Sequence, residues 1–340
     1  INPNRLRRLA KREQLGRQPM TLVDATESQA VVGRTLRQLA WSRLRKDRVA
    51  VASMIVLTFI VLIAIFGPLI SRWIGVNPYD FNTDLLSDAG SLPIGPFGGV
   101  SWDHPLGVEP LTGRDILARL LYGSRISLFI ALSATVITVV VGTIVGIVSG
   151  YSRGRTDTVL SRFMDITLAF PLLLVIIAMS PVLEQRLQAW GLPAGNPSRI
   201  TTLILVLSVF GWPYLARLIR GQVLSLRERE FVEAAVSIGS SKRRILFREL
   251  LPNLWAPILV YATIAMPGLI GAEAALAYLG ISVVPPTPTW GSMLQESVGY
   301  FTVDPFYFFV PLTMLLAAVL SFNLLGDALR DALDPKADRN

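Results

Sequence analysis

The chain has 340 residues, of which 52% are hydrophobic and only 16% are charged. So little charge among so many apolar residues excludes an ordinary soluble protein and predicts one that crosses the membrane several times. The lack of cysteine and the single histidine, His104, exclude a disulfide framework, thiolate chemistry and a histidine-built metal site. Cytoplasmic loops beside anionic lipid explain the formal net charge of +8, so we expect membrane lipid and no nucleic acid as a partner.

Residues 1–48 predict a cytoplasmic tail that ends in a helix. The tail contains twelve Lys or Arg and four Asp or Glu, and it lacks the apolar core of a signal peptide. Its last part places four apolar residues on one helical face, with arginines around them: Leu36, Leu39, Ala40 and Leu44. We therefore expect an interfacial helix on the inner membrane surface. For residues 1–33, an ordinary solvated basic tail is the alternative.

Residues 49–70 form the first predicted membrane-spanning helix. The run is uncharged, and about 20 residues that rise about 1.5 Å each are enough to cross the hydrocarbon core. Residues 71–125 follow as a predicted extracytoplasmic loop, because their acidic residues outnumber the basic ones. Within this loop, residues 113–125 have a charged face and an apolar face, which predicts an amphipathic helix at the outer surface. The apolar face consists of Ile116, Leu120 and Leu121.

Residues 126–326 predict a core domain with five further membrane-spanning helices. The apolar runs that define them are 126–152, 165–183, 200–218, 250–279 and 306–326. Gly142, Gly146 and Gly150 recur at every fourth residue, which predicts a smooth face where another helix approaches closely. Two of the runs contain a proline that predicts a kink in the helix: Pro171 and Pro213.

The charge distribution places both termini of the chain in the cytoplasm. Arginines follow the second and fourth runs, whereas residues 280–305 contain no Lys or Arg, so the former lie inside and the latter outside. Residues 327–340 then form a cytoplasmic C-terminal tail. Asp165, near the inner end of the third run, is expected to pair with Arg162 or Arg155.

Residues 227–252 form a highly charged island between two predicted spans. Gly239 lies where a left-handed residue usually ends a helix, and Ser240 or Ser241 can cap a second helix that begins at Lys242. The first helix places four residues on an apolar face: Phe231, Val232, Ala235 and Ile238. This pattern predicts a short amphipathic knob of two helices, which the charge distribution places in the cytoplasm.

Glu233-Ala234-Ala235, followed by Gly239 and then by Leu251-Pro252, resembles the EAA loop of ABC importer permeases. That loop docks onto the ATPase subunit in the family. The resemblance therefore implies that this chain meets an ATPase through Glu233, Ala234, Ala235, Gly239 and Pro252. Small alanines let a helix lie deep in a partner's groove, the glycine ends the helix sharply, and the charges fix the register.

Three further stretches resemble the C-type subunit of the dipeptide and oligopeptide (peptide/nickel) permeases. They are residues 104–128, which include His104-Pro105-Leu106-Gly107 and Gly113-Arg114-Asp115, residues 284–291, and residues 323–335. The family usually has Thr-Asp where this chain has Val108-Glu109. The resemblance implies the all-α, six-helix fold of type I ABC importers and a multi-pass location in the bacterial cytoplasmic membrane. It also implies a homologous second permease, two ABC ATPases and an extracytoplasmic substrate-binding protein as partners.

These features predict a permease subunit that is not itself an enzyme and whose peptide cargo crosses unchanged. The sequence has no Gly-Lys dipeptide and so no P-loop; we expect no cofactor on this chain, with ATP and Mg²⁺ used by the ATPase partners. Residues 150–154 match a nucleophile elbow, but they lie at the inner end of a membrane helix, across the membrane from His104. An ion-coupled carrier is the alternative transporter, although intramembrane acids are few. Nickel chelates, opines and oligosaccharides are alternative cargoes.

Glu273 and Trp212 are the candidates for a pathway or gate. An ionisable residue within a span costs roughly 3 kcal/mol on insertion and is therefore a functional candidate. Glu273 lies late in the fifth run, so packing at the outer end of the helix is the alternative. Trp212 lies between Gly211 and Pro213, in the predicted kink of the fourth run.

Overall fold

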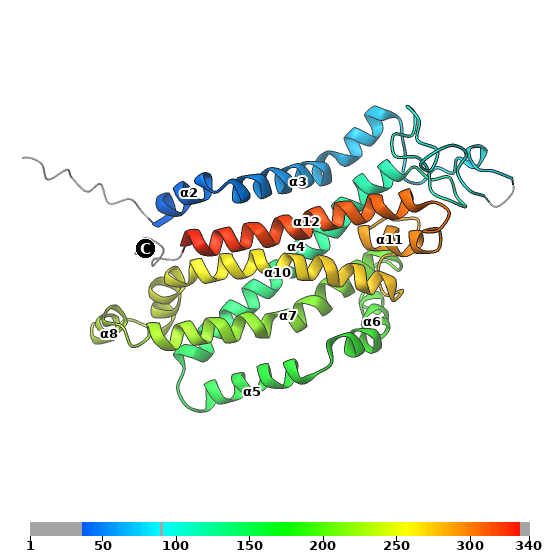
Figure 1. Cartoon of the computed structure of the whole chain (residues 1–340). Helices are drawn as coiled ribbons and strands as arrows, with labels where there is room; N and C mark the ends of the chain where they lie inside the picture. The colour runs from blue at the N-terminus through cyan, green and yellow to red at the C-terminus, as the bar shows by residue number, and fades with distance from the viewer. Residues whose placement is uncertain (1–35, 89–90, 334–340) are drawn as a thin grey trace, which may run out of the picture. The chain divides into compact units, whose positions relative to one another are not determined.

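The computed structural model describes residues 36–88 and 91–333 of the chain (Figure 1). Contacts divide the chain into two units, residues 1–39 and 40–340. Of the first unit only residues 36–39, the start of helix α2 (Leu36–Lys46), are described. The solvated tail considered for residues 1–33 and the end of the C-terminal tail, residues 334–340, lie outside the described residues.

Helices make up almost all of the regular structure in the described residues, and no named strand occurs among them. Six helical segments of this part are long and apolar enough to cross a membrane. They are α3 (Arg48–Ile74), α4 (Ile116–Tyr151), α6 (Leu172–Ala189), α7 (Asn196–Leu226), the continuous run Lys242–Tyr278, and α12 (Pro305–Leu333). The all-helical, six-span class is confirmed.

The run Lys242–Tyr278 changes its winding along its length. It starts as α9 (Lys242–Arg244), continues as the π-helix η2 (Ile245–Leu250) and the 3-10 turn η3 (Leu251–Leu254), and ends as α10 (Trp255–Tyr278). The shorter elements are η1 (Thr83–Leu85), α5 (Arg155–Ala169), α8 (Glu230–Ser237) and α11 (Trp290–Val298). No loop therefore separates the second half of the charged island from the fifth span.

Helix α4 begins ten residues before the predicted second span, at Ile116 rather than at Ile126. Asp115 caps it, since the carboxylate accepts a hydrogen bond from the Ala118 amide (2.6 Å) and pairs with His104 Nδ1 (2.8 Å). The predicted apolar residues are buried, and so are the predicted charged residues Arg114, Asp115 and Arg119. The expectation of a separate amphipathic helix at the outer surface over residues 113–125 is therefore wrong, because both faces of this segment are covered by protein.

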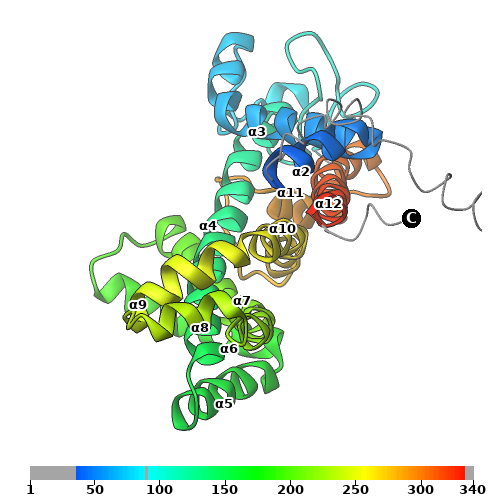
Figure 2. The same ribbon diagram turned by 90° about the vertical axis from the view of Figure 1, so that its left-hand side faces the viewer.

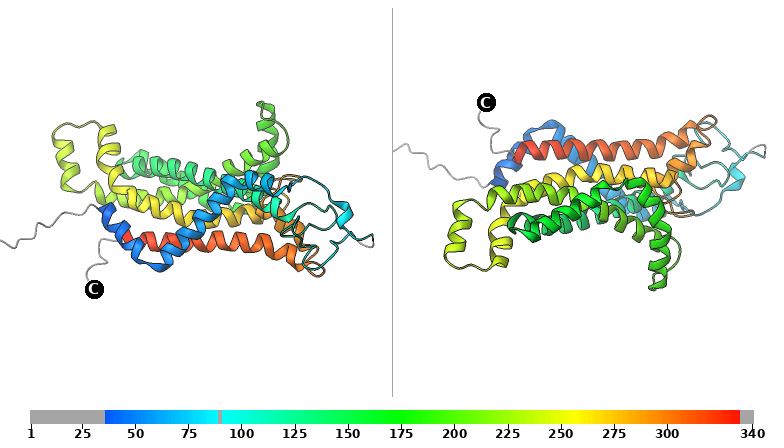
Figure 3. Two further views of the ribbon diagram at one scale, coloured as in Figure 1. Left: turned by 90° about the horizontal axis from the view of Figure 1, so that it is seen from above. Right: turned by 90° about the horizontal axis from the view of Figure 1, so that it is seen from below.

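The third predicted span is two helices rather than one kinked helix. Helix α5 ends at Ala169 and α6 starts at Leu172, with Phe170 and Pro171 extended between them. A residue that precedes proline is driven out of the helical region, and proline lacks the N–H that the helix needs, so the pair breaks the helix completely. Figure 3 shows that α6 runs at a steep angle to α5.

The predicted glycine stripe lies where α4 packs against α7, which is the most extensive helix contact in the structure. Ideal Cβ atoms on Gly142, Gly146 and Gly150 would lie only 2.9, 2.7 and 2.8 Å from the main-chain oxygens of Trp212, Ala216 and Arg220, respectively. Glycine is required here because the α7 backbone occupies the space of a side chain. The prediction of close helix approach is confirmed.

Helix α2, from Ala40 onward, packs on the end of α12. Ala40 and Leu44 are buried against Ala328 and Ala332, and Arg43 Nη1 donates a hydrogen bond to the Ala332 carbonyl (3.3 Å). The apolar positions that predicted an interfacial helix therefore face protein instead of lipid in this part of the helix.

Two ion pairs fasten α5 to α7. Asp157 accepts two hydrogen bonds from Arg220, to Oδ1 (2.7 Å) and to Oδ2 (2.8 Å), and Oδ1 accepts a third from Ser149 of α4 (2.7 Å). The hydrogen bonds from Arg220 hold the pKa of Asp157 well below its usual range. Asp165 is paired with Arg217 of α7 and also, at 4.0 Å, with Arg162, which is one of its two expected partners.

Asp157→Asn should destabilise the protein by roughly 1–2 kcal/mol at neutral pH, because it removes the charge that the Arg220 fork requires. A carboxylate with a depressed pKa stabilises the fold above its unfolded pKa of about 3.9 and loses that effect as the pH falls through the folded pKa. The melting temperatures of wild type and variant should therefore differ by a constant amount between pH 7 and about 4, and converge below.

Asp165→Asn is the matched control, since its pair with Arg217 is half exposed and contributes little. If Asp157→Asn lowers the stability of the protein no more than Asp165→Asn does, the Asp157–Arg220 pair is not what stabilises the packing of α5 on α7.

Candidate functional site

The charged island folds as predicted into two helices with a sharp break. Gly239 has φ +73°, and its amide donates to the Val236 carbonyl (2.9 Å), while the Ser240 amide donates to the Ala235 carbonyl (3.0 Å). These bonds satisfy the last carbonyls of α8. Of the two serines considered as caps, Ser241 is the one that accepts a bond from the Arg244 amide (3.4 Å).

Helix α8 is fixed to the two helices that flank it in the sequence. Val232 and Ala235 of α8 are buried in a cluster with Val223 of α7 and with Ile245 and Leu250 of η2. Figure 2 looks onto this end of the molecule, where α8 and α9 lie across the end of α7. The cluster joins α8 to both neighbours through apolar contacts, so the three elements form one packed unit.

The position of Ala235 corrects one expectation from sequence. Ala235 and Ala234 were both expected to enter a partner's groove, but Ala235 is 7% exposed and faces the chain's own core, while Ala234 is exposed. Consecutive residues on a helix point about 100° apart, so both cannot face one partner when Val232 and Ala235 define the inner face. Glu233, Gly239 and Pro252 are exposed, as a contact role requires.

The outward face of α8 is here named the exposed α8 face and comprises Glu230, Glu233, Ala234 and Ser237. Large apolar side chains border it, notably Val236 and Ile238, of which Ile238 is 77% exposed. A cavity of about 770 Å³ adjoins it, with charges of both signs in its lining: Arg153, Arg227, Glu228, Glu233 and Lys242. Exposed apolar side chains beside such a charged surface indicate a protein partner.

Glu273 is enclosed within the chain. It is 1% exposed, and its carboxyl group accepts hydrogen bonds from Ser282 (2.7 Å) and Ser127 (3.4 Å). These bonds join α10 to α4 and to the segment that follows α10. This is the arrangement expected for the alternative considered for Glu273, packing near the end of the helix.

Trp212 of α7 is also buried. Its ring stacks on that of Phe163 in α5, with 5.7 Å between the centroids, and it packs with Met164. Neither Trp212 nor Glu273 belongs to the lining of four principal cavities in the described part of the chain. A pathway or gate role for the two residues stays a prediction.

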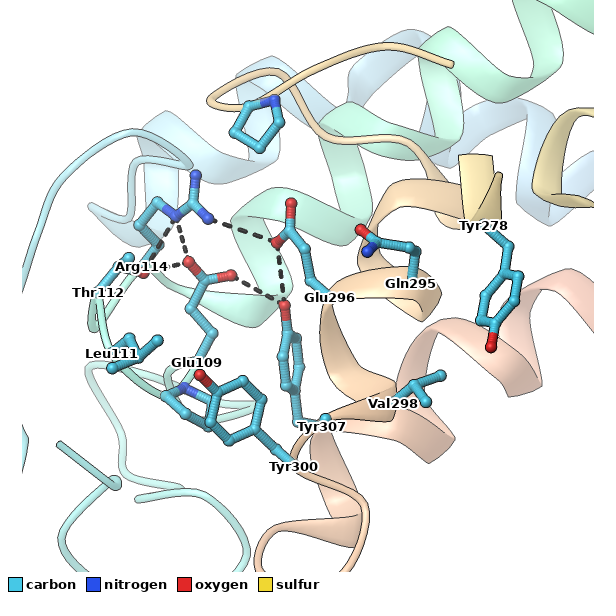
Figure 4. Close-up of a pocket in the computed structure, with 13 residues that line it drawn as sticks. Glu109, Leu111, Thr112, Arg114, Tyr278, Gln295, Glu296, Val298, Tyr300 and Tyr307 are labelled. Carbon is cyan, nitrogen blue, oxygen red and sulfur yellow. Dashed lines mark hydrogen bonds and ion pairs between the residues drawn. The ribbon is translucent and has the colours of Figure 1, made fainter. Parts of the chain in front are cut away.

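The structure also brings together a buried ionic cluster that the sequence did not reveal. Glu109 binds both Arg114 and Arg119, and Arg119 also reaches Glu296 (2.8 Å). The Tyr307 hydroxyl lies 3.1 Å from Glu109 and 3.2 Å from Glu296 (Figure 4). Glu109 is the residue at the position where the C-type family usually has Asp, which is the one signal in the sequence. Nothing local indicates Glu296, which lies far along the chain.

Comparison with known proteins agrees with this architecture. Residues 142–339 match the family model for the inner membrane component of binding-protein-dependent transport systems. The chain belongs to that family. Residues 35–93 also match the N-terminal transmembrane domain of oligopeptide transport permease C.

Curated relatives of this permease align over most of their length. It is 37% identical to the oligopeptide permease protein OppC of Bacillus subtilis, over 87% of this chain and 88% of the relative. It is 36% identical to the dipeptide permease protein DppC of Alkalihalophilus pseudofirmus, over 87% and 89%. The glutathione permease protein GsiD of Escherichia coli O6:K15:H31 is 37% identical over the same shares, 87% and 89%.

Among solved structures, an inward-facing MetNI methionine ABC transporter has the same fold, with a TM-score of 0.51. The similarity covers 64% of this chain and 96% of that chain at 20% identity. The permease is thus a multi-pass subunit of the cytoplasmic membrane, from an ABC importer of the oligopeptide and dipeptide kind. It is a transport component and not an enzyme.

Proposed function

We propose that this chain and a homologous second permease form a pathway for short peptides, and that α8 couples the pathway to two ABC ATPases. The observation that carries this proposal is the geometry of α8. Its outer face is exposed and bordered by apolar side chains, while its inner face is packed into α7 and η2. A helix held in this way is suited to receive a partner on one side and to transmit its motion on the other.

The coupling residues have distinct parts in this proposal. Glu233 supplies charge that fixes the register of the partner, and Ala234 allows close approach because its side chain is short. Gly239 ends α8, and Pro252 lies in the turn η3 that leads into α10. Closure of the ATPases on ATP moves α8 as a rigid body, and the apolar cluster around Val232 carries the movement to α7 and α10.

The other components of the importer follow from the same proposal. An extracytoplasmic substrate-binding protein delivers the cargo, and ATP and Mg²⁺ are bound by the ATPases, so this chain needs no cofactor. Peptide cargo is supported by the relatives, which are named for oligopeptide, dipeptide and glutathione transport. All three kinds of substrate contain amide bonds between amino acids.

Glu233→Arg should abolish recovery of the ATPases with this chain and reduce ATP-dependent peptide uptake at least tenfold, while the second permease is still recovered. Reversing a charge at the centre of a docking face costs several kcal/mol, and each 1.4 kcal/mol is about tenfold in affinity. The measurement is affinity purification from native membranes with identification of the bound subunits. Gly239→Pro should act in the same way, because proline cannot adopt φ +73°.

Asp331→Arg is the matched control, because it makes the same charge change at an exposed position of α12, outside the exposed α8 face. Normal uptake by Glu233→Arg would contradict the coupling assignment. Uptake that requires an ion gradient and continues without ATP would contradict the importer proposal as a whole.

A further inference from the structure

A hollow of about 730 Å³ lies at the opposite end of α10 from α8. It is formed by residues 109–114, the end of α10, α11 and the start of α12, and it is drawn in Figure 4. Its size falls within the range of small-ligand sites, about 300–1,000 Å³. Its charged floor is Glu109, Arg114 and Glu296, and tyrosines 278, 300 and 307 contribute to its walls.

The ionic cluster at the floor of the hollow has no net formal charge when Arg119, which is completely buried and does not itself line the hollow, is counted with it. The two carboxylates, Glu109 and Glu296, face the two guanidinium groups, Arg114 and Arg119. A free anion would meet the carboxylates, and a free cation would meet the guanidinium groups. The floor therefore favours a neutral dipolar group over an ion of either sign.

On this floor, Arg114 keeps a donor nitrogen and Glu296 keeps an acceptor oxygen that no hydrogen bond within the described part of the chain uses. The bonds of Glu296 to Arg114, Arg119 and Tyr307 all use Oε2. Arg114 donates through Nε and Nη2. Among the described residues no hydrogen bond involves Oε1 of Glu296 or Nη1 of Arg114, and Figure 4 shows both atoms without a dashed line. Glu296, at 20% exposure, is open to the hollow.

A donor beside an acceptor is the complement of an amide group. The Arg114 N–H can donate to an amide oxygen while the Glu296 carboxylate accepts from an amide N–H. Tyrosine rings and Leu111 supply apolar contact area around this polar pair. The geometry points to a binding site for a short extended peptide, held through its main-chain amides. This inference rests on the proposed function, since it assigns a cargo-binding site to the outer end of the permease.

The test measures binding of radiolabelled tetra-alanine to the intact importer complex, purified without its substrate-binding protein and held in lipid nanodiscs. Glu296→Gln should weaken binding roughly tenfold, the effect of losing one charge-assisted hydrogen bond. Gly299→Leu should weaken it at least as much by filling the hollow. Gly299 lines the hollow, has φ −65°, and has no atom within 4 Å of an ideal Cβ, so the variant is expected to fold.

Glu184→Gln is the matched control. Glu184 is 22% exposed and paired with Arg199 at 3.4 Å, outside the hollow, so its substitution should leave peptide binding unchanged. Loss of binding in Glu296→Gln and Gly299→Leu, with normal binding in Glu184→Gln, would support the inference. Absence of peptide binding, or equal binding by all variants, would overturn it.

A second measurement separates the free peptide from a peptide loop of the binding protein. If tetra-alanine does not bind, but Glu296→Gln weakens the affinity of the binding protein for the complex, the hollow holds that protein instead and the inference is wrong. Recovery of the ATPases and ATP-dependent uptake are followed in the same preparations. If the wild-type complex retains the ATPases and ATP-dependent uptake but binds no tetra-alanine, the proposed function stands and only this inference fails. If the wild-type chain recovers no ATPases and shows no ATP-dependent uptake, the proposed function itself is refuted.

Discussion

Gly146→Leu should prevent the close packing of α4 on α7 and remove most of the folded permease from the membrane. An ideal Cβ at this position would lie 2.7 Å from the Ala216 carbonyl oxygen and 2.8 Å from Ile219 Cβ. Neither neighbour can give way cheaply, because one is main chain and the other is a completely buried branched side chain. Overpacking costs about 1–3 kcal/mol when a core can adjust, and we expect at least the upper end here.

The measurement is the thermal stability of the purified complex and its abundance in the membrane, for alanine as well as leucine at position 146. Alanine normally stabilises a helix by about 1 kcal/mol relative to glycine, so a loss of stability for Gly146→Ala would reverse the usual sign. Gly221 of α7 is the control, because no atom lies within 4 Å of its ideal Cβ. Gly221→Ala should be neutral or stabilising, and equal behaviour of the two alanine variants would contradict a required close approach.

Arg119→Met should destabilise the packing of α4 on α11 and α12 by about 3–5 kcal/mol. Arg119 is completely buried and binds both Glu109 and Glu296. Methionine fills a similar volume, so the main effect is to leave buried negative charge without its partner. Arg119→Lys should recover only part of the loss, because an ammonium group cannot reproduce the planar fork that reaches two carboxylates.

Thermal inactivation of peptide uptake provides the measurement. Arg199→Met is the control, since Arg199 is partly exposed and pairs with Glu184 at 3.4 Å, so its loss should cost no more than about 1 kcal/mol. Adding Glu109→Gln to Arg119→Met should restore part of the stability by removing one of the unpaired charges. An Arg119→Met protein as stable as Arg199→Met would show that the cluster contributes nothing to stability.

The features that the sequence predicted well are those that depend on nearby residues. The apolar runs identify the membrane helices, the spacing of Gly142, Gly146 and Gly150 predicts the contact face of α4, and Gly239 ends α8 as expected. Each of these signals is carried within a few helical turns. The residues of the island likewise predict two short helices separated by a break, which the structure has as α8 and α9.

The features that were missed depend on contacts between distant segments. The inward turn of Ala235 follows from packing on η2, and the burial of Arg119 follows from Glu296, which lies 177 residues later. Hydrophobic periodicity assigned residues 113–125 to a surface helix because charged residues usually face water. Part of the counter-charge comes from Glu109, but the rest comes from Glu296 of α11, which no local pattern connects with α4.

The long sequence separation between Arg119 and Glu296 affects how the chain folds during its synthesis. Glu109 leaves the ribosome just before Arg119, but Glu296 follows Arg119 by 177 residues. At about 5–20 residues per second, that interval is roughly 10 to 35 s. Until α11 is synthesised, the start of α4 carries a guanidinium group with only part of its counter-charge. Tyr307 of α12, whose hydroxyl lies beside both glutamates, follows later still, so the cluster is complete only once α12 has been made.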